Sequence, residues 1–129
     1  MKFMSLFENL TQAEIKDCFV DKNDNIVFIV KENQIAKAIG KHGSNVKRLS
    51  EVLNRKIKIV EFNSNLLQFI RNMIRPLEIR EIKQDGPIVT IVGNDVKTKG
   101  LLIGRDAKNL RSLESVVKRY FQIGEIKII

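Results

Sequence analysis

The segment from Ile39 to Leu49 is IGKHGSNVKRL, and it says more about the fold than any other part of the chain. Gly40 and Gly43 flank two polar residues, Lys41 and His42. Glycines at this spacing allow a tight turn and a close approach to a ligand, because they carry no Cβ atom. The pattern predicts a short loop between two helices, with Lys41 and His42 at its tip.

This loop has the chemistry of an anion-binding site. It opens onto the expected start of a helix near Ser44, where free N–H groups and the helix dipole favour negative charge. Lys41 adds a positive charge, and His42 adds a donor that is charged or neutral near pH 7. A phosphodiester backbone fits all these features. The alternative interpretation is an ordinary turn with solvated side chains.

A second copy of the pattern lies 64 residues further along the chain. The segment 34–53, QIAKAIGKHGSNVKRLSEVL, is similar to 97–117, KTKGLLIGRDAKNLRSLESVV. The aligned pairs are Ile39 with Ile103, Gly40 with Gly104, Lys41 with Arg105, Asn45 with Asn109, Leu49 with Leu113 and Val52 with Val116. Because this spacing is almost half of 129 residues, we expect two copies of one unit, over 1–63 and 64–129.

Hydrophobic periodicity and turn residues predict the same element order in both units. In the first unit we expect strands over 14–20, 25–31 and 56–62, a helix capped by Asn33 that ends at Ile39, and a helix from Ser44 that carries Val46, Leu49, Val52 and Leu53 on one face and ends at Asn54. In the second we expect strands over 77–84, 88–93 and 125–129, helices on both sides of Gly104, and Gly124 as the end of the last helix. A helix over 66–74, stopped by Pro76, is expected to join the units. The fold class is α+β, with a three-stranded sheet packed against helices in each unit.

These features together resemble the KH family, whose signature is a GxxG loop between two helices. Strands before the loop and a strand after the second helix resemble the type II, prokaryotic-style arrangement. Two such modules in tandem are most similar to the archaeal NusA-like transcription factors. The resemblance covers nearly the whole chain, and it implies that the loop holds about four nucleotides of single-stranded RNA.

The resemblance also implies the site residues and the partners. The implied RNA-binding residues are Ile39, Gly40, Lys41, His42, Gly43, Ser44, Asn45, Lys47 and Arg48 in the first module, and Gly104, Arg105, Lys108, Asn109 and Arg111 in the second. Ile35, Ile39, Val46 and either Ile57 or Ile59 are expected near a groove for the bases. The implied role is to modulate transcription elongation, pausing, termination or antitermination by binding nascent RNA. RNA polymerase or the transcription complex is a partner by analogy.

The second loop departs from the family pattern. Ala107 replaces the last glycine, and Asp106 places a negative charge where a phosphate would pass. Ala107 is a mild change if its φ is negative, as in the first turn of a helix. Asp106 is expected to cap the following helix. We therefore expect the second loop to bind RNA more weakly than the first, or to act only as a scaffold.

The positive charge gathers around the two loops. The chain has 23 Lys and Arg against 15 Asp and Glu, for a net charge of +8. Residues 37–58 contain seven basic residues and one acidic residue, and 97–119 contain seven against two, whereas 1–36 are net negative. A basic surface of this kind favours a polyanionic partner. The low aromatic content of 6% argues against modules that bind RNA by ring stacking.

Other classes of function are disfavoured. One His, one Cys and the absence of any hydrolase, zinc or nucleotide-binding motif predict a protein that is not an enzyme, uses no cofactor and has no small-molecule substrate. The single Cys18 is expected to be a buried apolar residue. No apolar run suits a membrane span, so a cytoplasmic location is expected. The alternative functions are a ribosome-associated or rRNA-processing KH protein, and an adaptor that binds proteins.

Overall fold

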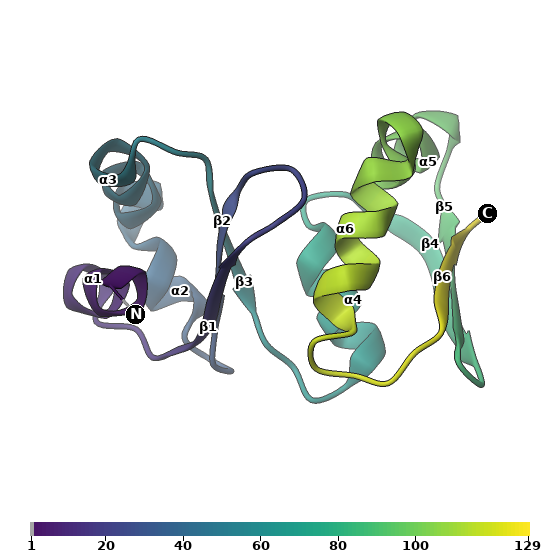
Figure 1. Ribbon diagram of the computed structural model, residues 1–129, viewed down its shortest axis with the longest axis horizontal. Coiled ribbons are helices and arrows are strands. Elements are labelled where there is room, and N and C mark those ends of the chain that lie inside the picture. The colour runs from purple at the N-terminus through teal and green to yellow at the C-terminus, as the bar shows by residue number, and fades with distance from the viewer. Residues whose placement is uncertain (1) are drawn as a thin grey trace. The chain divides into compact units, whose positions relative to one another are not determined.

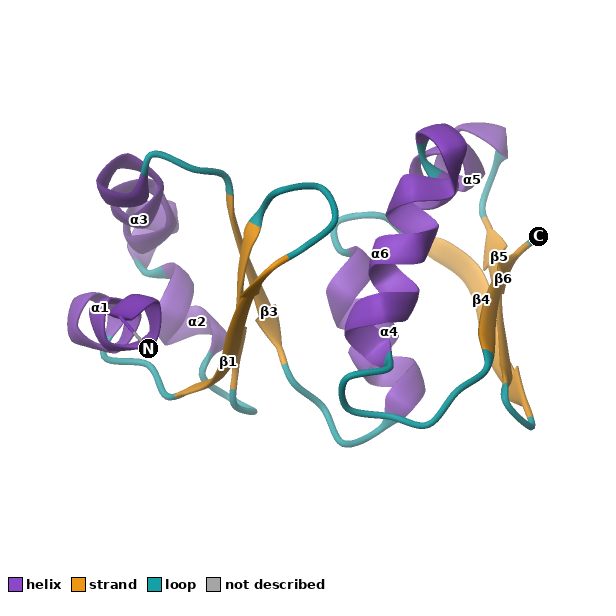
Figure 2. Cartoon of the chain, viewed as in Figure 1, coloured by secondary structure: helices purple, strands orange, loops and turns teal. Residues whose placement is uncertain are grey.

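The computed structural model describes residues 2–129, which divide into two compact units. The first unit ends at Ser64, and the second runs from Asn65 to Ile129. Both have the order helix, strand, strand, helix, 3₁₀ turn, helix, strand. In each unit, three helices lie on one face of a three-stranded sheet (Figures 1 and 2). The α+β class expected from the sequence is confirmed.

The first unit is a hairpin followed by a helical crossover. Its elements are α1 (Lys2–Thr11), β1 (Ile15–Val20), β2 (Ile26–Val30), α2 (Ile35–Ile39), η1 (Lys41–Gly43), α3 (Ser44–Leu53) and β3 (Ile57–Glu61). Strand β1 pairs antiparallel with β2, and β2 pairs parallel with β3. A parallel pair needs a crossover, which α2, η1 and α3 supply. As a consequence, the glycine loop lies at the opposite end of α3 from the start of β3.

The core of the first unit lies between the sheet and its helices. The Phe7 ring of α1 stacks on the Phe28 ring of β2, with centroids 4.4 Å apart. Ala38 and Leu49, from the helices on either side of the loop, are fully buried in the same cluster. Burial of a leucine side chain such as that of Leu49 stabilises the fold by roughly 1.5–3 kcal/mol. The loop is therefore held between two anchored helices.

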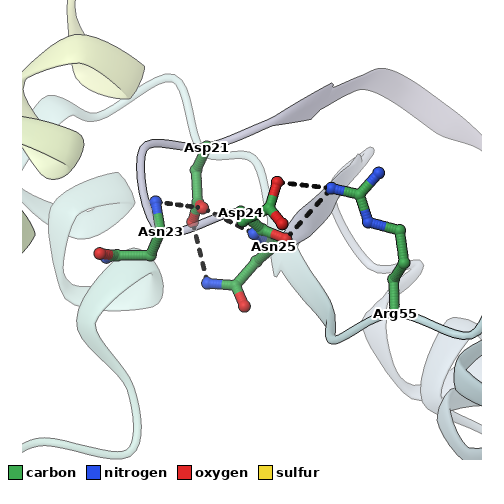
Figure 3. A network of polar contacts seen from close by, with 5 residues as sticks. All are labelled: Asp21, Asn23, Asp24, Asn25 and Arg55. Carbon is green, nitrogen blue, oxygen red and sulfur yellow. Dashed lines mark hydrogen bonds and ion pairs between the residues drawn. The ribbon is translucent and has the colours of Figure 1, made fainter.

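A polar network closes the end of the first sheet that lies away from the glycine loop (Figure 3). The Asp21 carboxylate accepts hydrogen bonds from the backbone N–H groups of Asn23 and Asn25, both at 2.9 Å. Arg55, from the segment between α3 and β3, donates to the Asp24 carboxylate at 2.7 Å and to the Asp24 carbonyl oxygen at 3.3 Å. The network connects the β1–β2 turn to the residues that lead into β3.

The second unit repeats this arrangement. Its elements are α4 (Leu66–Ile74), β4 (Ile79–Asp85), β5 (Ile88–Gly93), α5 (Val96–Ile103), η2 (Arg105–Ala107), α6 (Lys108–Val117) and β6 (Glu125–Ile128). Strand β5 is again central, antiparallel to β4 and parallel to β6. Helix α4 is part of this unit, because its buried Phe69 ring contacts the rings of Tyr120 and Phe121. It occupies the place that α1 has in the first unit.

Two of the expected helix ends are wrong. Asn33 does not cap α2; the N-cap residue is Gln34, which has no side-chain cap. Asn33 has a left-handed φ of 67°, not the extended backbone of an N-cap residue. Its N–H donates to the Glu61 carboxylate at 2.7 Å, which holds the backbone in this position. Gly124 does not end α6, which stops at Val117; instead its N–H donates to the Pro87 carbonyl oxygen at 2.7 Å.

The expected apolar face of α3 is wrong at one position. Val52 is 60% exposed, whereas Leu49 is fully buried. A helix turns by about 100° per residue, so Val52 lies about 120° around the axis from Val46, at the edge of the apolar face. The corresponding Val116 of α6 is buried. Asn54 does end the helix, with the left-handed φ of 51° that suits asparagine.

One further expectation about local structure is confirmed. Cys18 is buried, with 3% of its surface exposed. Among residues 2–129, no helix is both long and apolar enough to cross a membrane.

Candidate functional site

The first glycine loop begins where α2 ends. Gly40 has φ 78° and ψ 172°, a backbone conformation that residues with a Cβ atom rarely adopt. A Cβ atom here would also lie 2.9 Å from the Asn45 amide carbon and the Ser44 hydroxyl. Glycine is thus required at position 40 both by the backbone conformation and by the close Ser44 and Asn45 side chains.

The tip of the loop is left-handed at two successive residues. His42 has φ 57° and ψ 29°, and Gly43 has φ 72° and ψ 18°. The Gly43 N–H donates to the Gly40 carbonyl oxygen at 3.2 Å, and the Ser44 N–H donates to the Lys41 carbonyl oxygen. A Cβ atom on Gly43 would meet nothing within 4 Å, so glycine is favoured there only by its φ angle.

The loop presents donors and positive charge to solvent. Lys41, His42, Ser44, Lys47 and Arg48 are exposed, while Ile39, Gly40, Gly43 and Asn45 are half-buried. Within residues 2–129, no carboxylate pairs with Lys41, Lys47 or Arg48, and no acceptor receives the backbone N–H of Lys41 or His42. Two free N–H groups beside unpaired cations suit a phosphate.

The second loop has the same backbone as the first. Gly104 has φ 74° and ψ 174°, Asp106 has φ 56° and ψ 31°, and Ala107 has φ 60° and ψ 22°. The Ala107 N–H donates to the Gly104 carbonyl oxygen at 3.2 Å, and the Lys108 N–H donates to the Arg105 carbonyl oxygen. The backbones of the two loops therefore follow the same course, and the loops differ only in the side chains that they expose to a ligand.

One expectation about the second loop is wrong, and the condition under which Ala107 would be a mild change is not met. Asp106 does not cap α6, whose N-cap residue is Ala107 and which has no side-chain cap. Ala107 has a positive φ rather than the negative φ of a first helical turn, because the turn imposes the same left-handed conformation that Gly43 has in the first loop. The Asp106 carboxylate is exposed, and it makes no ion pair or hydrogen bond within the described chain.

Several basic residues of the segments 37–58 and 97–119 have structural partners or are buried. Arg111 forms an ion pair with Glu114 at 3.1 Å, and the buried Glu114 also accepts the Ile126 N–H from β6 at 2.8 Å. Arg55 is held by Asp24 at the far end of α3. Burial lowers the pKa of Lys58, and the nearby Asp21 partly opposes that shift. The charge that faces a ligand is therefore smaller than the count along the sequence. Lys108 and Arg105 stay exposed.

The apolar residues expected near a base-binding groove lie on three elements of the first unit. Ile35 and Ile39 lie on α2, Val46 on α3, and Ile57 and Ile59 on β3; all five are half-buried. Ile35, Ile57 and Ile59 pack against the buried core. These three side chains therefore contribute to folding, whatever contact they make with a ligand.

Sequence reasoning missed the role of the two asparagines behind the loops. The Asn45 side-chain amide donates to the Lys37 carbonyl oxygen at 3.1 Å, and the Asn109 amide donates to the Leu101 carbonyl oxygen at 2.8 Å. The signal was the recurrence of asparagine five residues after the first glycine of both loops.

Among the described residues, no group of three or more His, Cys, Asp or Glu side chains could hold a metal ion.

Comparison with known proteins agrees with this geometry. The chain is 32% identical to the probable transcription termination protein NusA of Methanocaldococcus jannaschii, covering 98% of this chain and 70% of that protein. It is 33% identical to the protein of the same name from Methanococcus vannielii, covering 98% and 74%. The crystal structure of APE1850 matches with a TM-score of 0.77 and 27% identity, over 99% of this chain and 96% of that one. A family model described as KH domain matches residues 4–85, which run from within α1 to the end of β4 and contain the first glycine loop. The chain belongs to the KH domain family.

Proposed function

We propose that this chain binds single-stranded RNA, with the first glycine loop holding the sugar–phosphate backbone. The observation that carries the proposal is the pair of unused N–H groups of Lys41 and His42, beside exposed cations. This loop also lies inside the segment that matches the KH family. Hydrogen bonds from a backbone N–H to an anion are about twice as strong as neutral ones.

The second unit is, in this proposal, a second type II KH module with a weaker loop. Its element order and loop backbone support this interpretation, since both repeat those of the first unit. Its loop places Asp106 where the first has His42. A carboxylate at this position repels a phosphate, so the second loop contributes less affinity than the first.

The proposed role is in transcription, where the protein would bind nascent RNA and modulate elongation or termination. The names of the archaeal relatives support this role. RNA polymerase or the transcription complex is the proposed protein partner. The proposed activity is binding rather than catalysis, and it needs no cofactor.

The test is a titration of short single-stranded RNAs, followed by fluorescence anisotropy at several salt concentrations. Wild type is compared with Lys41→Asp/His42→Asp, which reverses the charge at the loop tip. Lys22→Asp/Lys56→Asp is the control, because both lysines are exposed and lie at the end of the first sheet away from the loop. Helix α3 separates the two ends by about 15 Å.

The proposal predicts that the loop variant loses most of its affinity, and that its dependence on salt becomes shallower. The control removes at least as much positive charge, yet it should keep most of the binding. Circular dichroism verifies that both variants fold. Undiminished binding by the loop variant, or equal losses in the two variants, would show that the positive charge acts without a specific loop.

A further inference from the structure

We infer that Asn45 positions the first glycine loop for RNA by replacing a backbone donor in the hydrogen-bonding ladder of α2. In an uninterrupted helix, the Lys37 carbonyl oxygen would accept the N–H of Lys41, four residues further on. The chain leaves the helix at Gly40, and the Asn45 side-chain amide donates to that carbonyl oxygen instead, at 3.1 Å. This inference rests on the proposed function.

The consequence is that the loop keeps its own donors for a ligand. Carbonyl groups at a helix end need a partner, and the nearest candidate for Lys37 is the N–H of Lys41. The Asn45 amide gives that carbonyl a partner after the chain has turned away, and the N–H groups of Lys41 and His42 have no acceptor within the described chain. Asn45 thus lets α2 end at Gly40 while the Lys37 carbonyl keeps a hydrogen-bond partner.

The same device occurs in the second unit. The Leu101 carbonyl oxygen would accept the N–H of Arg105 in a continuous helix, and the Asn109 amide occupies it at 2.8 Å. Here too, the N–H groups of Arg105 and Asp106 have no acceptor in the part of the chain that the structure describes. The two residues after the glycine differ between the loops, Lys-His in the first and Arg-Asp in the second, yet the hydrogen bond is the same. The arrangement therefore depends on the glycine and the asparagine.

Each asparagine also explains the first glycine of its loop. A Cβ atom on Gly40 would lie 2.9 Å from the Asn45 amide group, and one on Gly104 would lie 2.6 Å from the Asn109 amide carbon. The asparagine side chain covers the glycine, and only a residue without a Cβ atom leaves room for it. The glycine and the asparagine five residues later therefore act as one unit.

The test compares Asn45→Ala with wild type by RNA anisotropy and by thermal unfolding. The Asn45–Lys37 bond is exposed, so water can solvate the freed carbonyl, and Tm should stay within about 5 °C of wild type. Affinity should fall about tenfold, the effect of one hydrogen bond to a charged group. Asn109→Ala should have a smaller effect, because the second loop contributes less.

Ser50→Ala is the matched control. The Ser50 hydroxyl donates to the Arg55 carbonyl oxygen at 3.0 Å, so this variant removes a comparable bond at the other end of the same helix. It should keep wild-type affinity. NMR adds a readout that stability alone would not change: RNA should shift the Lys41 and His42 amide signals in wild type and in Ser50→Ala, and much less in Asn45→Ala.

Failure of this inference can be distinguished from failure of the proposed function. Wild-type affinity in Asn45→Ala, with binding lost in Lys41→Asp/His42→Asp, would overturn the positioning role and leave RNA binding by the loop in place. An affinity loss in Ser50→Ala as large as in Asn45→Ala would also overturn it, since any loosening of α3 would then suffice. If Lys41→Asp/His42→Asp bound RNA as tightly as wild type does, both RNA binding by the first loop and the positioning role of Asn45 would be wrong.

Discussion

Ala107 has the same left-handed backbone conformation as Gly43, its counterpart in the first loop. The φ and ψ angles are 60° and 22° for Ala107, and 72° and 18° for Gly43. A residue with a Cβ atom is strained there by roughly 1–2 kcal/mol. The second loop has therefore kept its path even though its sequence no longer has the glycine that relieves this strain.

This pair predicts opposite effects for two reciprocal substitutions. Ala107→Gly should raise the free energy of unfolding by up to about 1 kcal/mol, because relief of strain exceeds the added entropy of the unfolded chain. Gly43→Ala should lower it by a similar amount, although its Cβ atom would have room. Urea denaturation measures both.

Gly100→Ala is the control for this prediction. Gly100 lies within α5, its φ is not positive, and a Cβ atom there would meet nothing within 4 Å. Alanine should therefore stabilise the second unit by roughly 0.5–1 kcal/mol. A stabilising effect of Gly43→Ala, matching that of Gly100→Ala, would contradict the assignment of strain to the loop.

The charge of Asp106 should limit RNA binding by the second loop. Asparagine tolerates a left-handed backbone, so Asp106→Asn removes the charge without disturbing the turn. In the Lys41→Asp/His42→Asp background, where the first loop is disabled, this change should raise the residual RNA affinity several-fold with an unchanged Tm. Anisotropy at low salt measures it; an unchanged affinity would mean that the second loop is a scaffold.

Glu114 should matter for stability rather than for RNA binding. Its carboxylate is buried and accepts the Ile126 N–H and an Arg111 donor, so Glu114→Ala leaves a buried N–H without a partner. That loss should cost about 1–3 kcal/mol of unfolding free energy. Glu51→Ala, at an exposed position on α3, should cost little. Equal effects on denaturation would refute the assignment.

Cys18 should be unreactive in the folded protein. Burial, and to a smaller extent the Asp17 carboxylate, raise the pKa of the Cys18 thiol from 9.0 to about 11. The neutral thiol is therefore favoured in the folded state. Its stabilising contribution is fully present below pH 9 and declines as the pH rises towards 11. A thiol reagent at pH 8 should label Cys18 only on unfolding, and rapid labelling of native protein would contradict this.

The repeat and the glycine spacing carried most of the fold prediction. The helix that follows the glycine loop in each unit, Ser44–Leu53 or Lys108–Val117, falls where the alignment around Gly40 and Gly104 places it. Strand β5 was predicted with its observed limits, because a β-branched run between Pro87 and Gly93 leaves little choice.

What the sequence did not reveal depends on partners that are distant along the chain. The Glu61 carboxylate, 28 residues away, takes the N–H of Asn33, and the β6 backbone engages Glu114. Arg55 and Arg111 belong to the basic segments of the sequence, but their charges pair with the carboxylates of Asp24 and Glu114. Local patterns indicate which residues can cap or bind; tertiary contacts decide which of them do.

The most direct test of the account is an NMR titration of the uniformly ¹⁵N-labelled protein with a short single-stranded RNA. Binding at the first glycine loop predicts that the largest amide shifts fall between residues 40 and 48, led by Lys41 and His42, with weaker shifts around Arg105. Large shifts confined to other surfaces, with the first loop unchanged, would contradict the central claim that this loop holds the RNA backbone.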